Sequence, residues 1–307
     1  DHDSVSAFDS VTRVRLAEIP AGTLPHSVAV APDGRVWVVN TGSATISIID
    51  PAGLSVASTV NLPPASRPFG LAFDPDGSDA WIACEGSGQL LRLNPLTGGQ
   101  TGALQLGLHI RHVSVDASST RVFVSRFITP RLPGEESASV QTGNAGGEVI
   151  AVLSSPLTVE RTIRLQHSEF PDSPVSGRGI PNYLGVAAVS PDGLSAWIAG
   201  KQDNIKRGML RDGSQLTPDL SVRSITSRLD LSAGTPLTDD LNSRMDHDNA
   251  GIAVNTLWDP FGIYVFTALE GSRAVSVMDA WNRRELMRFE TGRAPQGLAL
   301  SPDGGTL

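Results

Sequence analysis

A short phrase that recurs along the chain most strongly constrains its fold. Its four full copies are PHSVAVAPDG (25–34), PFGLAFDPDG (68–77), LGVAAVSPDG (184–193) and PQGLALSPDG (295–304). Degenerate copies lie in 111–127 and 253–270. The equivalent positions are Pro32, Pro75, Ala117, Pro191, Pro260 and Pro302. The repeat is therefore about 42–44 residues long, with insertions of roughly 30 residues in two of the steps, and repeats of this length are typical of propellers and solenoids.

Each repeat predicts four antiparallel strands. A short strand of small residues precedes the Pro-Asp-Gly turn, where proline presets φ and glycine takes the positive φ. The predicted second strands carry an aromatic residue. They include Val36–Asn40, Ala80–Cys84 and Ala196–Gly200. The predicted third strands are Ile46–Asp50, Gln89–Leu93, Glu148–Leu153 and Ala274–Asp279. The predicted fourth strands are Ala57–Leu62, Gly102–Leu106, Glu160–Leu165 and Glu285–Glu290.

Four antiparallel strands per repeat make a propeller blade, so the sequence predicts an all-β propeller over 1–307 as one domain. Five blades are complete, with repeats that start near 25, 68, 110, 184, 253 and 295. Insertions are expected near 128–147, 167–182, 201–218 and 232–250. Val11–Ile19 is expected to be a fourth strand without its own blade. Because the last repeat stops after its turn, we expect the native protein to continue past Leu307.

Composition excludes several classes of function. The net charge is −8, so no broad electrostatic attraction to nucleic acid or anionic lipid is expected. Cys84 is the only cysteine, which rules out an internal disulfide, a c-type haem attachment or a four-cysteine zinc site in this segment. No stretch reaches the roughly 18 apolar residues of a membrane span. The start, Asp1–Ser4, has no signal-peptide pattern, so either a signal was removed or the chain is an internal piece.

The repeated phrase followed by a β-rich run resembles the YVTN family of β-propellers. Trp37-Val38-Val39-Asn40 stands at the position of the tetrad that names the family, whereas AWIAC (80–84) and AWIAG (196–200) depart from it at the asparagine. The resemblance implies seven blades in the intact protein and an extracytoplasmic location, periplasmic, secreted or on a bacterial-type cell surface. A narrower resemblance, carried by residues 180–193, 201–213, 246–249 and 292–304, is to secreted bacterial proteins in which a propeller precedes a c-type haem domain.

Ligands of propellers usually bind where inner strands begin and long connections gather. The residues predicted to bind a ligand or partner on this basis are His26, Arg111, His112, Asn182, Tyr183, Lys201, Asp203, Asn204, Lys206, Arg207, Arg211 and Gln296. Segment 201–213 is read first as a solvated loop and second as an anion or partner-docking site, because its arginines suit carboxylates and phosphates. The group Asp246-His247-Asp248 is a candidate metal site, for calcium or for a transition metal, with loop capping as the alternative.

No catalytic residue is predicted, and the chain lacks a G-x-S-x-G elbow. We therefore expect a non-catalytic binding or scaffold propeller that docks a protein or an attached domain, with no cofactor in this segment. One alternative is the propeller half of a periplasmic redox enzyme, with c-type haem only if a further domain follows. The other is a metal-dependent propeller hydrolase or lyase that uses Asp203, Asp246, His247 and Asp248. Cys84 is expected to be a packed thiol.

Overall fold

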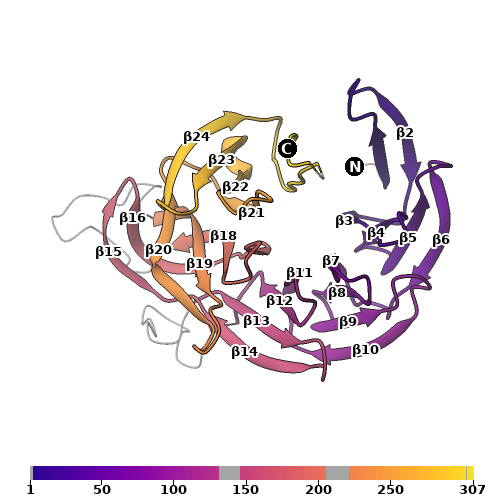
Figure 1. Cartoon of the computed structure of the whole chain (residues 1–307), viewed down its shortest axis with the longest axis horizontal. Coiled ribbons are helices and arrows are strands. Elements are labelled where there is room, and N and C mark those ends of the chain that lie inside the picture. The colour runs from indigo at the N-terminus through magenta and orange to yellow at the C-terminus, as the bar shows by residue number, and fades with distance from the viewer. Residues whose placement is uncertain (1–2, 131–145, 205–220, 302) are drawn as a thin grey trace. The chain divides into compact units, whose positions relative to one another are not determined.

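The computed structural model describes residues 3–130, 146–204, 221–301 and 303–307, and its regular elements there are strands apart from the short 3-10 helix η1 (Glu270–Ser272). Within these ranges no helix is long and apolar enough to cross a membrane. Strand follows strand along the whole described chain (Figure 1). The all-β prediction is confirmed.

Most strands form four-stranded antiparallel sheets in chain order, as a propeller requires. The first sheet contains β3 (Pro25–Val30), β4 (Val36–Asn40), β5 (Thr45–Asp50) and β6 (Ser55–Asn61). The second contains β7 (Pro68–Phe73), β8 (Ala80–Cys84), β9 (Gln89–Leu93) and β10 (Gln100–Gln105). The third contains β11 (Ile110–Val115), β12 (Arg121–Arg126), β13 (Glu148–Leu153) and β14 (Thr158–Arg164).

The fourth sheet is larger than its repeat predicts. It runs β15 (Ser168–Ser173), β16 (Ser176–Asn182), β18 (Ser195–Asp203), β19 (Val222–Asp230) and β20 (Thr238–His247), and the short inner strand β17 (Ala187–Val189) also pairs with β18. The fifth returns to four strands, β21 (Ala253–Trp258), β22 (Tyr264–Leu269), β23 (Ala274–Asp279) and β24 (Arg284–Glu290). The protein is thus a β-propeller with about five blades.

Four segments differ in detail from the sequence prediction. Segment 167–182 is a strand pair, β15 and β16, that extends the fourth sheet. Segment 232–250, read as an insertion, contains β20, the strand that follows β19 in that sheet. The stretch 11–19 supplies only part of β2 (Arg15–Pro20), which pairs with an unpredicted strand, β1 (Ser4–Phe8). Residues 295–300, where a further inner strand is predicted, are not a strand.

By its internal contacts the chain divides into two compact units, whereas its sequence predicts a single domain. Unit 1 comprises 1–124 and 153–158, and unit 2 comprises 125–152 and 159–307. In unit 1 the aromatic strand β4 packs against the second sheet in a core that includes Trp37, Ile48, Ile82 and Leu91. In unit 2 a core contains Trp197, Met245, Val265 and Met278. Trp37 and Trp197, both on second strands, therefore fill the space between neighbouring sheets.

Strand position decides how much of each strand is buried. The second strand β8 is buried at every residue, because sheets cover both of its faces. The outer strand β10 alternates between exposed and partly buried residues, as expected for a strand with one solvated face. The turns follow their sequence: the glycines of two Pro-Asp-Gly turns, Gly34 and Gly77, have φ of 87° and 77°. Each donates its N–H to the residue three positions earlier, Ala31 or Asp74.

Candidate functional site

The inner strands of the first two sheets each begin with a β-bulge. In β3 the pairing register shifts between Pro25 and Ser27, which leaves His26 as the extra residue. In β7 it shifts between Pro68 and Gly70, which leaves Phe69 in the same position. A bulge re-aims the side chain of its extra residue and is common next to binding sites. The bulges therefore explain why side chains at the strand starts can meet.

In unit 1 five side chains meet at these strand starts and form what we call the His26 cluster: His26, Phe69, Glu85, Arg111 and His112. The His26 ring stacks on Phe69, with 4.4 Å between centroids, and His112 meets Phe69 edge-on at 5.2 Å. The guanidinium carbon of Arg111 lies 4.6 Å from the centre of the Phe69 ring. Three blades thus supply one aromatic and cationic cluster.

Glu85 holds Arg111 in this arrangement. Its Oε1 accepts hydrogen bonds from Nη2 of Arg111 at 2.6 Å and from Nε at 3.2 Å. Glu85 is itself only 9% exposed, so this charge-assisted pair is well shielded from water. No functional role is predicted for Glu85 from the sequence, although its Glu-Gly-Ser motif recurs at 270–272.

Burial and nearby positive charge keep the two imidazoles neutral. Burial lowers the pKa of His112 to about 3, with Arg111 and His26 adding to the effect. Burial also lowers the pKa of His26, and Arg111 and Arg67 act in the same direction while Glu85 opposes them. His26 is nevertheless an exposed residue, although its ring stacks on Phe69. Neutral imidazoles beside guanidinium groups can accept a proton when an anion arrives.

In unit 2 a second group, the Tyr183 cluster, contains Phe127, Asn182, Tyr183, Lys201 and Asp203. The Phe127 and Tyr183 rings are stacked, with 4.6 Å between centroids. Nζ of Lys201 lies 4.1 Å from the centre of the Tyr183 ring and 3.0 Å from Oδ1 of Asp203. Oδ1 of Asn182 accepts the N–H of Tyr183, which has a φ of 53°. The structure therefore brings together four of the predicted binding residues.

One position in the repeat explains both clusters. The residue directly after the second strand contacts the next repeat in four cases, either at the start of its inner strand or, at Tyr183 and Gln296, in a segment that is not part of that strand. Its contacts are Thr41 Oγ1 to Pro68 O (2.5 Å), Glu85 to Arg111 (2.6 Å), Phe127 to Tyr183 (4.6 Å) and Glu270 Oε1 to Gln296 Nε2 (3.1 Å). We call it the latch position. The fold fixes where the latch residue lies, and its chemistry varies from repeat to repeat.

The remaining predicted binding residues are placed as follows. Gln296 is exposed and bonded to Glu270, while the Asn204 N–H donates to the carbonyl of Ser221 at 2.9 Å. Lys206, Arg207 and Arg211 lie outside the described residues. The binding role predicted for 201–213 can therefore be followed only as far as Asn204.

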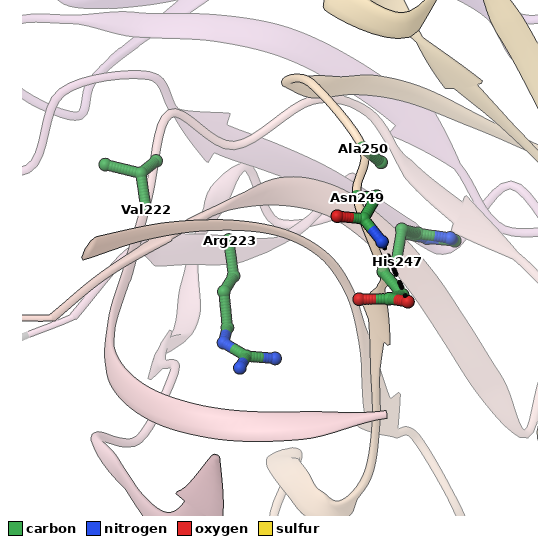
Figure 2. A pocket seen from close by; sticks show the side chains of 6 residues that line it. Val222, Arg223, His247, Asn249 and Ala250 are labelled. Carbon is green, nitrogen blue, oxygen red and sulfur yellow. Dashed lines mark hydrogen bonds between the residues drawn. The ribbon is translucent and has the colours of Figure 1, made fainter. Parts of the chain in front are cut away.

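Two of the three candidate metal residues, His247 and Asp248, line a small pocket in unit 2 (Figure 2), together with Val222, Arg223, Asn249 and Ala250. Asp246 is buried and already paired with Arg223, with 3.0 Å between Oδ2 and Nη1. His247 is also buried, and its Nε2 lies 2.7 Å from Oγ1 of Thr226. Burial lowers the pKa of His247 to about 4. Asp248 is exposed and accepts the amide of Asn249 at 3.1 Å.

Strand geometry keeps the side chains of Asp246 and His247 apart, since successive side chains of β20 point to opposite faces. In the part of the chain that the structure describes, no three His, Cys, Asp or Glu side chains gather closely enough to hold a metal ion. A metal at Asp246-His247-Asp248 stays a prediction, and it would need a ligand set that these residues do not supply by themselves.

A buried ionic network in the same sheet is not predicted from the sequence. Arg244 bonds to Asp239, with 2.9 Å between Nη2 and Oδ2, and to Gln202, with 2.9 Å between Nη1 and Oε1. Burial raises the pKa of Asp239 and that of Asp246. The partners come from β18 and β20, so only the sheet pairing, and no local motif, could have shown them.

Comparisons with known proteins bear on the fold. Neither a protein-family model nor a curated protein sequence matches this chain. Among solved structures it is similar to hydrazine synthase of Kuenenia stuttgartiensis, with a TM-score of 0.78, 17% identity, and coverage of 98% of this chain and 84% of that one. A putative 6-phosphogluconolactonase of Bacteroides uniformis matches with a TM-score of 0.62, 16% identity, and coverage of 95% and 79%.

Virginiamycin B lyase of Staphylococcus aureus matches less closely, with a TM-score of 0.55, 11% identity, and coverage of 87% of this chain and 70% of that one. Structures with such different names share the fold, and identities this low support the fold alone. Function must therefore be argued from the side chains of this chain.

Proposed function

We propose that this chain is a non-catalytic, extracytoplasmic binding or scaffold propeller that docks a partner protein or an attached domain, and that it belongs to the seven-bladed YVTN type. The observation that carries the proposal is the His26 cluster, in which three blades place aromatic and cationic side chains at their inner-strand starts. Aromatic and arginine side chains are the residue types that most often anchor protein interfaces.

The burial and pairing of the polar side chains around His247 in unit 2 favour a binding role over catalysis. Thr226 and His247 form a hydroxyl–imidazole pair of the kind that nucleophilic enzymes use, but their exposed fractions are 0% and 3%. Arg223 already neutralises the neighbouring Asp246. This burial favours a structural role in the sheet for the Thr226–His247 pair.

Site-specific photo-crosslinking in the native host would test the proposal. A benzophenone amino acid replaces His26 in the intact protein, and irradiation should give one discrete adduct, identified by mass spectrometry, in the periplasmic or surface fraction. The matched control carries the same group at Thr59, an exposed position on the outer strand β6 of the same sheet. The proposal fails if the two positions give the same adducts, or if the protein fractionates with the cytoplasm.

The second candidate function is the propeller half of a periplasmic redox enzyme with a c-type haem domain. It draws support from the similarity to a structure named hydrazine synthase over nearly all of this chain. The haem would belong to a further domain, since Cys84 is the only cysteine here. A covalent-haem stain of the protein purified from its native host distinguishes the two: a stained band supports the redox reading, and an unstained full-length band removes it.

A metal-dependent hydrolase or lyase is the third reading, suggested by the neighbours named 6-phosphogluconolactonase and virginiamycin B lyase. It needs a metal near Asp246, His247 and Asp248, with calcium as the oxygen-ligand choice. Elemental analysis of the purified protein, followed by the same analysis of His247→Ala, tests it. A metal content that is equal in both proteins would remove this site from consideration.

A further inference from the structure

The surroundings of His26 include a cation that the ion pairs of the cluster do not use. Arg67 directly precedes Pro68 and Phe69, is exposed, and helps to lower the pKa of His26 through its charge. Its guanidinium has no hydrogen-bond or ion-pair partner among the residues that the structure describes. An exposed guanidinium two residues along the chain from the stacked Phe69 is a fork-shaped donor suited to planar or tetrahedral oxyanions.

The two imidazoles of the cluster also have unused hydrogen-bonding capacity. Neither the His26 ring nor the His112 ring is hydrogen-bonded to another residue of the described ranges, while both contact Phe69. Contacts with Phe69 therefore hold both rings in place, and of the two residues His26 is the exposed one that a ligand can reach. Such preorganisation reduces the entropy lost on binding.

We propose that Arg67 and His26, supported by His112, form an oxyanion-binding site that takes up a proton when it binds a carboxylate or phosphate group. This inference names the ligand chemistry of the face used in the proposed function and rests on that function. Arg67 supplies the fixed charge, and His26 supplies the proton-dependent one. Arg111 adds positive potential, although Glu85 offsets most of it by pairing with Arg111 at 2.6 Å.

The sign of the pH dependence follows from the groups around His26. Arg67 and Arg111 disfavour the imidazolium, and Glu85 favours it more weakly than burial opposes it. A bound oxyanion adds a negative charge and favours the imidazolium, so binding and protonation strengthen each other. Affinity should therefore rise as pH falls from 7.5 toward 5.5.

Titration calorimetry with inorganic phosphate and, separately, with succinate tests the site in the intact protein. Runs at pH 7.5 and 5.5, in two buffers of different ionisation enthalpy, count the protons taken up. We expect saturable binding, at least about tenfold tighter at pH 5.5, with uptake of a fraction of a proton to about one. Tighter binding of phosphate or of succinate assigns the oxyanion to that class.

Three variants separate a built site from general charge attraction. Arg67→Gln should weaken binding about tenfold, whereas Arg13→Gln, at another exposed arginine of unit 1, should leave it unchanged. His26→Phe keeps an aromatic ring to stack on Phe69 and should abolish proton uptake. Equal effects of Arg67→Gln and Arg13→Gln, or no saturable binding of either anion at pH 5.5, would overturn the inference.

The calorimetry and the photo-crosslinking can fail independently. A discrete adduct at His26 without anion binding would overturn the oxyanion site and leave the docking function in place. Anion binding without an adduct would support the site and count against the docking of a protein or domain.

Discussion

Trp81 donates a hydrogen bond from its indole Nε1 to Oδ1 of Asp74, with 2.6 Å between the two atoms. In the preceding repeat Trp37 occupies the equivalent place, opposite Ala29 as Trp81 is opposite Ala72. There Ala31 stands at the position of Asp74, and the buried Nε1 of Trp37 has no hydrogen-bond partner among the described residues. The two tryptophans therefore differ in one interaction while both are 0% exposed.

This pair allows the hydrogen bond to be measured against its own control. Trp81→Phe leaves a buried carboxylate oxygen without its donor, whereas Trp37→Phe removes a donor that has no acceptor. The free energy of unfolding in urea should fall by about 1–3 kcal/mol more in Trp81→Phe than in Trp37→Phe. The loss from reduced ring volume is common to both variants. Equal losses would show that the Trp81–Asp74 bond contributes nothing net.

The strands could be predicted from the sequence because their signals are local. The Pro-Asp-Gly turns place glycine where φ must be positive, as at Gly34 and Gly77. The β-rich runs on either side contain the predicted strands, and three of the predicted third strands, such as Gln89–Leu93, match to the residue. A repeat also lets a strong copy identify a weak one, which is how 253–270 was recognised.

The candidate site was only partly predictable, because its contacts join residues far apart in the sequence. His26, Arg111 and His112 were predicted from their place at strand starts, and the structure brings them together through Phe69. The bond from Glu85 to Arg111 spans 26 residues, and no local pattern shows it. The sequence does mark Glu85 in another way, because Glu-Gly-Ser recurs at 85–87 and 270–272 and both glutamates are latch residues.

The ion pair of Arg244 with Asp239 should be costly to break. Their side chains are 3% and 0% exposed, so removal of Arg244 leaves a carboxylate buried without its counter-ion. Arg244→Met should lower the free energy of unfolding at pH 7.5 by about 3–5 kcal/mol. Arg244→Met combined with Asp239→Asn should recover part of this loss, because no net charge then remains buried. Urea unfolding of the three proteins measures both quantities.

The pH dependence of the stability lost in Arg244→Met tests whether an unpaired buried carboxylate causes that loss. Burial raises the pKa of Asp239, so the folded state holds a proton there more strongly than the unfolded state. The cost of Arg244→Met should therefore shrink as pH falls and Asp239 takes up the proton. As a control, Glu18→Gln breaks the exposed Arg15–Glu18 pair and should change the free energy of unfolding little at any pH. A cost of Arg244→Met that does not vary with pH would contradict the mechanism.

His247 should make the fold sensitive to mild acid. Burial lowers its pKa to about 4, below the ordinary value of 6.5, so the unfolded state binds a proton that the folded state does not. The stability that the neutral ring contributes is complete above pH 6.5 and is lost as pH falls toward 4. His247→Gln should remove up to about 3 kcal/mol of that acid-induced loss.

The measurement is the free energy of unfolding in urea at several pH values between 4 and 8. The slope against pH, and not the absolute stability, reports on His247, since the variant also alters the 2.7 Å contact with Thr226. Asn242→Ser, at an exposed position of the same strand, should retain the parent slope. If His247→Gln also retains it, the imidazole titrates normally and the pocket beside it is open to protons.

The thiol of Cys84 should be unreactive toward disulfide reagents while the protein is folded. It is 0% exposed in the core between the first two sheets, and burial raises the pKa of its thiol to about 12. Only the thiolate attacks a disulfide reagent, so at pH 8 labelling must wait for unfolding. The native protein should react on the order of a thousandfold more slowly than the urea-unfolded protein. A cysteine introduced at exposed Thr59 in a Cys84→Ala background should react at once. Rapid labelling of native Cys84 would mean that β8 opens locally, and the core that joins the two sheets would then be weaker than its packing indicates.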